Sequence, residues 1–252
     1  MQKLIVKSQK ETGLLDTSTN LIHLRGKDIH LEPNLVPGVG DRIRIKGDEF
    51  LVLEPDPVLF PDYASRTAQI IQPWDSAVIL QYCCIIPGKH VLESGIGSGA
   101  LSLSILRAIG IEGKLTTVEV NVDYIEKARQ NVQTAIDTDN WDIVNGSIET
   151  FRTDEKYDSV ILDVPEPWSA IPNVSSLLKK GGKICTYSPT YNQLEKNCTA
   201  MREHGFYVQS SIEILKRDIL VRENATRPDN NVIGHTAFMT FGTRLSGSTI
   251  KV

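Results

Sequence analysis

The stretch Val91-Leu-Glu-Ser-Gly-Ile-Gly-Ser-Gly-Ala100 decides how the rest of this sequence is interpreted. Its apolar start predicts a buried strand, and residues 100–109 place Leu101, Ile105 and Ile109 on one face of a helix. Between them, three glycines spaced G-x-G-x-G predict a sharp turn that can lie close to a ligand, because glycine has no Cβ. A strand, a glycine turn and a helix in this order are typical of nucleotide-binding α/β folds.

The sequence from residue 73 onward alternates between helical and strand-like patterns. We expect helices at 75–85, 100–109, 123–136, 171–178 and 192–204, and strands at 89–93, 115–120, 141–144, 159–162 and 183–187. The pair Gly181-Gly182 is expected to end the fourth helix. Residues 207–215 and 235–241 predict a long antiparallel hairpin at the end. This order predicts an α/β fold with a doubly wound, mainly parallel sheet and a ligand at the carboxyl ends of its strands.

Residues 1–62 have a different pattern, which predicts a small β-rich N-terminal domain before a larger one at 63–252. Strand-like runs lie at 3–7, 20–24, 42–46 and 50–53, and tight hairpin connections are expected at 38–41 and 46–48. Three prolines then interrupt both helix and strand, which indicates a linker of restrained flexibility: Pro55, Pro57 and Pro61.

The composition excludes several classes of protein. The chain has 252 residues, of which 40% are hydrophobic, and a net charge of −4, which argues against a protein that simply coats nucleic acid. No apolar run approaches the roughly 20 residues of a membrane span, and the N-terminus lacks a secretory signal, so we expect a cytoplasmic protein. The four cysteines show no C-x-x-C spacing and predict no metal site: Cys83, Cys84, Cys185 and Cys198.

Acidic residues at two strand ends bear on the choice of cofactor. Glu93 precedes the glycine turn, and Glu119 ends the next strand, where it can bind both hydroxyls of a ribose. NAD is one alternative, but a dinucleotide site more often has the spacing G-x-G-x-x-G, which places a helix N-terminus against pyrophosphate. S-adenosylmethionine has no phosphate and carries a sulfonium cation, so acids around a bare glycine turn favour it.

A further carboxylate follows the apolar run Val160-Ile-Leu162, at the edge of the sheet where a substrate is expected. This residue, Asp163, is followed by prolines that stiffen the backbone and by Trp168, whose flat face can stack on a base. We interpret Asp163 as a functional residue. The alternative is a helix N-cap or a loop carboxylate, with Trp168 in the core.

Together these motifs resemble the tRNA adenine-58 N1-methyltransferases over nearly the whole chain. The residues that carry the resemblance are Gln69-Ile-Ile71 with Pro73 and Asp75, Val91 to Gly99, Val118-Glu119, Leu162-Asp-Val-Pro-Glu-Pro-Trp168 and Gly234-His-Thr-Ala-Phe238. The resemblance implies a class I (Rossmann-like) methyltransferase domain, a small N-terminal β domain and a homotetramer. It also implies transfer of a methyl group from S-adenosylmethionine to N1 of an adenine in the T-loop region of tRNA, at position 58 and potentially 57.

The resemblance also assigns roles by position. Asp163 corresponds to the active-site aspartate of the family. The residues implied to bind the cofactor are Gln69, Glu93, Gly95, Gly97, Ser98, Gly99, Ala100, Leu101, Glu119, Gly146, Ser147 and Asp163. The candidates for contact with the adenine or the RNA are Gln72, Trp168, Tyr187, Arg222 and His235. One departure concerns Gln72, which stands where many relatives have Tyr.

Two other functions remain open at this point. A different class I methyltransferase, such as one acting on a protein isoaspartyl carboxylate, would share the glycine turn but has no need of the segment 163–168. A non-catalytic RNA-binding subunit could keep the fold, although it would have little use for Glu119, the glycine turn and Asp163 together.

Overall fold

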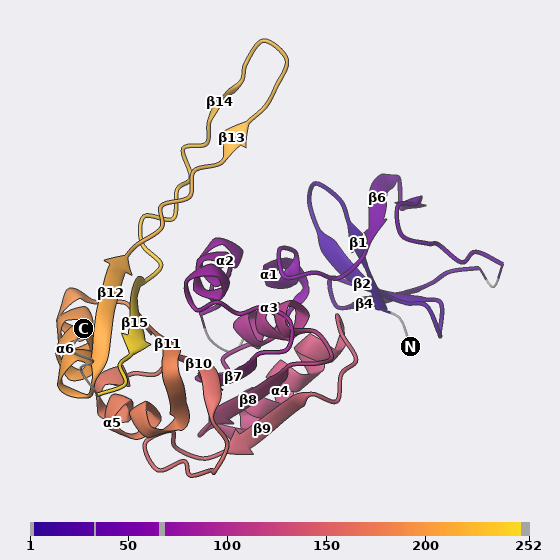
Figure 1. The fold of residues 1–252 in the computed structure, drawn as a ribbon. Helices are drawn as coiled ribbons and strands as arrows, with labels where there is room; N and C mark the ends of the chain where they lie inside the picture. The colour runs from indigo at the N-terminus through magenta and orange to yellow at the C-terminus, as the bar shows by residue number, and fades with distance from the viewer. Residues whose placement is uncertain (1–2, 33, 66–68, 248–252) are drawn as a thin grey trace.

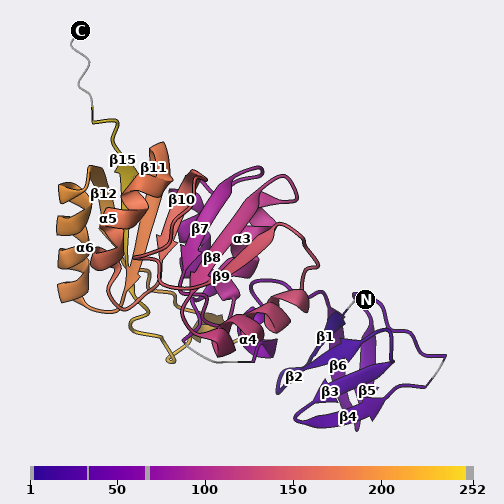
Figure 2. The same ribbon diagram turned by 90° about the horizontal axis from the view of Figure 1, so that it is seen from below.

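The computed structural model describes residues 3–32, 34–65 and 69–247, which form two large sheets and a short two-stranded one. Six strands near the N-terminus make the smaller sheet, and seven later strands make the larger one (Figure 1). Two views at right angles show the smaller sheet to the side of the larger one, beyond the helices that cover it (Figures 1 and 2).

The smaller sheet is antiparallel throughout, in the order β4-β3-β2-β1-β6-β5. Its strands are β1 (Lys3–Lys7), β2 (Thr12–Asp16), β3 (Leu21–Leu24), β4 (Lys27–His30), β5 (Arg42–Ile45) and β6 (Asp48–Leu53). The sheet has a hydrophobic core of its own, which includes Leu15, Ile22 and Phe50. The β-rich N-terminal region is therefore confirmed. The boundary at residue 62 stays a prediction, with the core of the small sheet ending at Val52.

Sequence patterns missed two of these strands and misplaced one turn. Strand β2 contains Gly13, whose added Cβ would lie 2.6 Å from the His23 carbonyl oxygen, so close strand pairing requires glycine there. Strand β4 is a mostly exposed edge strand without apolar alternation. The hairpin expected at 46–48 joins β5 to β6, whereas residues 38–41 only form a turn that leads into β5.

The larger sheet confirms the predicted fold class. Its strands are β7 (His90–Ser94), β8 (Lys114–Glu119), β9 (Trp141–Asn145), β10 (Tyr157–Leu162), β11 (Leu178–Ser188), β12 (Phe206–Ile212) and β15 (Phe238–Arg244). They lie in the order β12-β15-β11-β10-β7-β8-β9, and only β15 runs antiparallel to its neighbours. The order of parallel strands reverses between β7 and β10, which is where such sheets open a crevice for a ligand.

Helices cover both faces of this sheet (Figure 1). The first hydrophobic core contains residues of α1 (Phe60–Tyr63), α2 (Pro73–Tyr82), α3 (Ala100–Ile109) and α4 (Val122–Gln133). The second contains residues of α5 (Pro167–Leu177) and α6 (Tyr191–Glu203). Because both faces are covered, the central strands β7, β8 and β10 are buried along nearly their whole length.

Two predicted helix ends were wrong. Helix α5 ends at Leu177 and β11 begins at once, so the pair Gly181-Gly182 lies inside that strand rather than after the helix. There the register between β10 and β11 shifts, and an added Cβ on Gly182 would lie 2.8 Å from the Lys179 carbonyl oxygen. Helix α4 is capped by Asn121, whose Oδ1 accepts from the Asp123 N–H, and it ends at Gln133 rather than at the predicted residue 136.

The predicted C-terminal hairpin is present but interrupted. Strands β12 and β15 pair as expected, and residues 213–237 between them leave the sheet as a projecting arm (Figure 1). The arm contains the short strands β13 (Ile219–Leu220) and β14 (Arg227–Pro228). In the part of the chain that the structure describes, no helix is both long and apolar enough to cross a membrane.

Candidate functional site

A cavity of about 790 Å³ opens where β7, β8, β9, β10 and β11 end. Its size falls within the roughly 300–1,000 Å³ of small-molecule sites. Its lining consists of Gln69, Ser94, Gly95, Gly97, Val118, Glu119, Val120, Asn121, Tyr124, Gly146, Ser147, Ile148, Glu149, Asp163, Val164, Pro165, Glu166, Tyr187, Pro189 and Gln193. The position agrees with the crevice that the strand order predicts.

The glycine turn is required by packing as well as by backbone conformation. Gly95 has φ 91°, and an added Cβ would lie only 1.8 Å from the carbonyl oxygen of Asp163. Gly99 has φ 87°, and its Cβ would lie 2.8 Å from Val132 Cγ2 in α4. The first glycine therefore brings the turn against the end of β10, and the second brings α3 against α4.

Glu119 is oriented by backbone donors at the edge of the cavity. Its Oε2 accepts from the Ile96 N–H (3.0 Å) and its Oε1 accepts from the Asn121 N–H (2.9 Å). Only 8% of the residue is exposed. Each carboxylate oxygen can accept a second hydrogen bond, so the same group that holds the glycine turn can also receive two hydroxyl donors of a ligand.

Glu93 lies behind the turn rather than on the cavity wall. It is 1% exposed, and its Oε2 accepts from the Ser102 hydroxyl (2.6 Å) and the Thr117 hydroxyl (2.8 Å). Its Oε1 has no hydrogen-bond partner. Burial raises the pKa of Glu93 to about 7, and the negative charges of Asp163 and Glu119 add to the rise.

Asp163 lies between these acids and the open cavity. Its N–H donates to the Ser94 carbonyl (2.8 Å), which fixes the end of β10 against the end of β7, and the residue is half-buried on the cavity wall. Burial raises the pKa of Asp163 to about 7, and the Glu119 carboxylate adds to the rise. A site that gathers carboxylates in a dry environment favours a cationic ligand, because a positive charge stabilises their ionised forms.

Tyr187 closes another side of the cavity and is held by a buried acid. Its hydroxyl donates to Asp75 Oδ2 (2.9 Å), and Asp75 in α2 is fully buried. Burial raises the pKa of both side chains. Asp75, which the sequence motif contains, therefore acts at the site by holding Tyr187. The sequence alone did not identify this pair.

Eight of the residues predicted from the sequence come together on the cavity wall: Gln69, Gly95, Gly97, Glu119, Gly146, Ser147, Asp163 and Tyr187. The other cofactor candidates lie outside the lining, because the chain turns away to begin α3 or is buried behind the turn: Glu93, Ser98, Gly99, Ala100 and Leu101. The predicted cofactor residues that line the cavity therefore lie at the start of the turn, at the ends of strands and at Gln69, and the roles of all twelve stay a prediction.

Most of the predicted substrate residues lie elsewhere. Trp168 is in α5, and Nζ of Lys196 in α6 lies 4.4 Å from the centroid of the Trp168 ring. Gln72 precedes α2 and donates to the Ile70 carbonyl. His235 binds Glu213 (2.5 Å) and the Pro189 carbonyl (2.8 Å), which places it beside the cavity as a support. Arg222 is exposed near the tip of the arm, between β13 and β14, and does not line the cavity.

Several lining residues were given no binding role from the sequence. Val120 and Asn121 follow β8, Val164 to Glu166 follow β10, and Pro189 follows β11, so all of them lie within four residues of the end of a predicted strand. Tyr124 and Gln193 project from α4 and α6, and no sequence pattern indicates them. The described lining contains four acids and no Lys or Arg, which disfavours a ligand that carries phosphates.

Known proteins resemble this chain in sequence and fold. The family model described as "tRNA methyltransferase complex GCD14 subunit" matches residues 50–227. A tRNA (adenine(57)-N(1)/adenine(58)-N(1))-methyltransferase TrmI of Methanocaldococcus jannaschii is 31% identical over 221 residues, with 77% of this chain and 78% of that protein covered. A tRNA (adenine(58)-N(1))-methyltransferase TrmI of Thermus thermophilus is 30% identical, with 86% of each covered. A structure described as a SAM-dependent O-methyltransferase of Thermotoga maritima has a TM-score of 0.86, 26% identity, and coverage of 99% and 95%.

The contact between Gly95 and Asp163 predicts a specific cost of substitution. We expect Gly95→Ala to lower the free energy of unfolding by about 2 kcal/mol or more, because the new methyl group overlaps a carbonyl oxygen and the φ angle is unfavourable for alanine. Urea denaturation measures this. The matched control is Gly146→Ala in the same lining, where an added Cβ meets nothing within 4 Å. Equal losses for the two variants would contradict the account.

The buried carboxyl of Glu93 predicts a pH-dependent stability. Its pKa rises from 4.5 to about 7 on folding, so its favourable contribution is complete below pH 4.5 and is lost as the pH rises through about 7. Glu93→Gln resembles the protonated form and keeps an acceptor for both hydroxyls. In urea denaturation, we expect the free energy of unfolding of Glu93→Gln to exceed that of the wild type by about 3 kcal/mol at pH 8. Near pH 4.5 the two free energies should be equal. The control is Glu112→Gln at an exposed position. A difference in free energy of unfolding between Glu93→Gln and the wild type that does not change with pH would refute the prediction.

Proposed function

The chain belongs to the family of the tRNA methyltransferase complex GCD14 subunit, and on that premise we propose how its own residues serve the reaction. The protein is a class I, S-adenosylmethionine-dependent methyltransferase that acts on N1 of an adenine in the T-loop region of tRNA. Position 58 is the proposed target, since it is named for both relatives, and position 57 is an additional target in the name of one. The observation that carries the proposal is the half-buried Asp163 beside the glycine turn.

The residues present fit S-adenosylmethionine. The cavity has room for it, and the lining that the structure describes has four acids and no Lys or Arg. Glu119 is the proposed partner of the ribose hydroxyls, and Gly146 with Ser147 is the proposed contact of the cofactor's adenine; all three residues line the cavity. When bound, the cofactor supplies an electrophilic methyl carbon on a sulfonium sulfur.

Asp163 is the proposed catalytic residue. N1 of adenine already has an in-plane lone pair, so no base is needed to create the nucleophile, and the product is a cationic base. The Asp163 carboxylate can accept a hydrogen bond from N6 of the adenine and stabilise the positive charge that grows on the ring. In a site sheltered from water, such an electrostatic interaction has a larger effect than it has in solvent.

The remaining lining residues orient the target base. N1 lies on the pairing edge, so the adenine must leave the folded RNA before it can react. Tyr187 offers a ring on the cavity wall, and its bond to the buried Asp75 fixes that ring in place. Positioning of the base along the line of methyl transfer is the second proposed contribution of this chain.

A homo-oligomer is also part of the proposal, with a tetramer implied by the family resemblance. Its support is the projecting arm (residues 213–237), which exposes large apolar side chains that are 43–80% accessible: Leu215, Ile219, Val221, Val232 and Ile233. Apolar surface of this kind marks interaction sites in proteins. A cytoplasmic location accompanies a tRNA substrate in this proposal.

Nucleoside mass spectrometry tests the proposed function directly. An unmodified tRNA transcript incubated with the protein and S-adenosylmethionine should gain 1-methyladenosine, and a transcript with guanosine at both positions 57 and 58 should not form that product. Asp163→Asn should lower kcat at least about 100-fold, because it removes the negative charge that stabilises the product. The exposed Asp154→Asn in the loop between β9 and β10 is the control.

The outcomes separate the alternatives. A folded protein that binds S-adenosylmethionine without forming 1-methyladenosine would overturn the tRNA assignment, and an isoaspartyl peptide would then be the next substrate to assay. A protein that binds RNA but not the cofactor would indicate a non-catalytic subunit. An Asp163→Asn variant with the rate of the wild type would contradict the role given to Asp163.

Light scattering tests the proposed assembly. The wild type should have the mass of a homo-oligomer, and Leu215→Asp with Val221→Asp should reduce that mass, since both side chains are exposed on the arm. The exposed Ile111→Asp, near the end of α3, is the matched apolar control. A monomeric wild type would refute the oligomer.

A further inference from the structure

The segment between the two large sheets (residues 54–72) is anchored to the larger domain at Pro55 and at Phe60. It leaves β6 at Leu53, and Arg107 Nη2 in α3 donates to the Pro55 carbonyl (2.6 Å). Phe60 in the short helix α1 is fully buried in the core of the larger domain. The segment is therefore part of the larger domain's structure and not a free connection.

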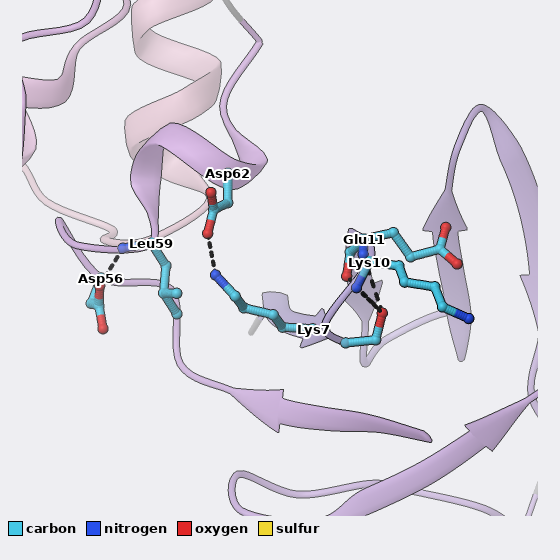
Figure 3. Close-up of polar contacts among 7 residues, drawn as sticks. Lys7, Lys10, Glu11, Asp56, Leu59 and Asp62 are labelled. Atoms are coloured by element: carbon cyan, nitrogen blue, oxygen red, sulfur yellow. Dashed lines mark hydrogen bonds and ion pairs between the residues drawn. The ribbon is translucent and has the colours of Figure 1, made fainter. Parts of the chain in front are cut away.

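The same segment also contacts the smaller sheet. Lys7 in β1 forms an ion pair with Asp62 in α1, and the Leu59 N–H donates to Asp56 Oδ1 (2.7 Å) just before that helix (Figure 3). Figure 3 shows the Lys7 side chain reaching from the strand to α1. The ion pair between Lys7 and Asp62 therefore links the position of α1 to the first strand of the smaller sheet.

The side chain of Asn131 joins this segment to the glycine turn. In α4, Asn131 is 7% exposed, and its Oδ1 accepts from the Ser65 N–H (2.9 Å). Its Nδ2 donates to the Ser65 carbonyl (3.0 Å) and to the Ser98 carbonyl (3.0 Å). The amide thus uses both of its N–H groups and its oxygen, and every partner is a backbone group.

The position of Asn131 in α4 is otherwise apolar. Its neighbours Ala128 and Val132 are buried, and an added Cβ on Gly99 would contact both of them. A buried amide costs free energy unless its hydrogen bonds are made, so an apolar residue would be the simpler choice for packing alone. The three hydrogen bonds are what an asparagine contributes at this position.

We propose that Asn131 is a positioning residue for the methyl-donor site. It holds Ser98 of the glycine turn and Ser65 of the interdomain segment at fixed positions on one helix. Gln69, four residues after Ser65, lies on the cavity wall, and so do Gly95 and Gly97 of the turn. Asn131 thereby fixes the glycine turn relative to Ser65, which follows α1 and the ion pair of α1 with the smaller sheet. This inference rests on the proposed function, since it assumes that S-adenosylmethionine binds here.

Calorimetric titration with S-adenosylmethionine tests the proposal. Asn131→Ala should raise the Kd about tenfold or more, because three hydrogen bonds that shape the site are lost. At saturating cofactor, kcat and the KM for tRNA should stay within about twofold of the wild type, since Asn131 does not touch the lining acids. Gln130→Ala on the exposed face of the same helix is the control, because the Gln130 side chain donates to the exposed Glu126.

A second variant separates positioning from packing. Asn131→Asp keeps the volume and one acceptor but places an oxygen against the two carbonyl oxygens, so it should weaken cofactor binding at least as much as Asn131→Ala. An Asn131→Asp protein with the Kd of the wild type would overturn the proposal, and so would a folded Asn131→Ala protein with unchanged Kd. Failure of the wild type itself to bind S-adenosylmethionine would instead overturn the proposed function, and the inference with it.

Discussion

The close contact between the backbone of Gly95 and the carbonyl of Asp163 is the constraint on which the site depends. No side chain can occupy the space between them, and the Asp163 N–H is bonded at the same point to the Ser94 carbonyl. The ends of β7 and β10 are therefore locked together at the place where the parallel strand order reverses. Because of this contact, the acid that follows β10 always lies beside the turn that follows β7.

Three carboxylates gather around this contact, and each is stabilised differently. Glu119 is held by two backbone N–H groups, Glu93 by two hydroxyls in the interior, and Asp163 faces the cavity with few donors. Burial and mutual repulsion raise the pKa of Glu93 and Asp163. A bound cation would reduce that repulsion. The negative charge of these acids therefore complements the positive charge of the methyl donor.

The site also depends on contacts from outside the sheet. The interdomain segment supplies Gln69, helix α2 supplies the acid that holds Tyr187, and the base of the arm supplies His235 against the Pro189 carbonyl. Gln69 and Asp75 are six residues apart, whereas His235 follows Asp75 by 160 residues. The larger sheet fixes the acids and the turn, and the elements that surround it shape the space in which an adenine and a methyl donor could meet.

The sequence by itself determined the α/β order, the glycine turn and the acids at strand ends, because periodicity and glycine spacing are local properties. It could not determine that Trp168 packs beneath Lys196, that Glu93 lies behind the turn, or that β11 starts without a loop after α5. Nor could it pair Tyr187 with Asp75, or Asn131 with Ser65 and Ser98. Those outcomes were decided only by the tertiary structure, since burial and hydrogen-bond partnership depend on which distant segments the folded chain brings into contact.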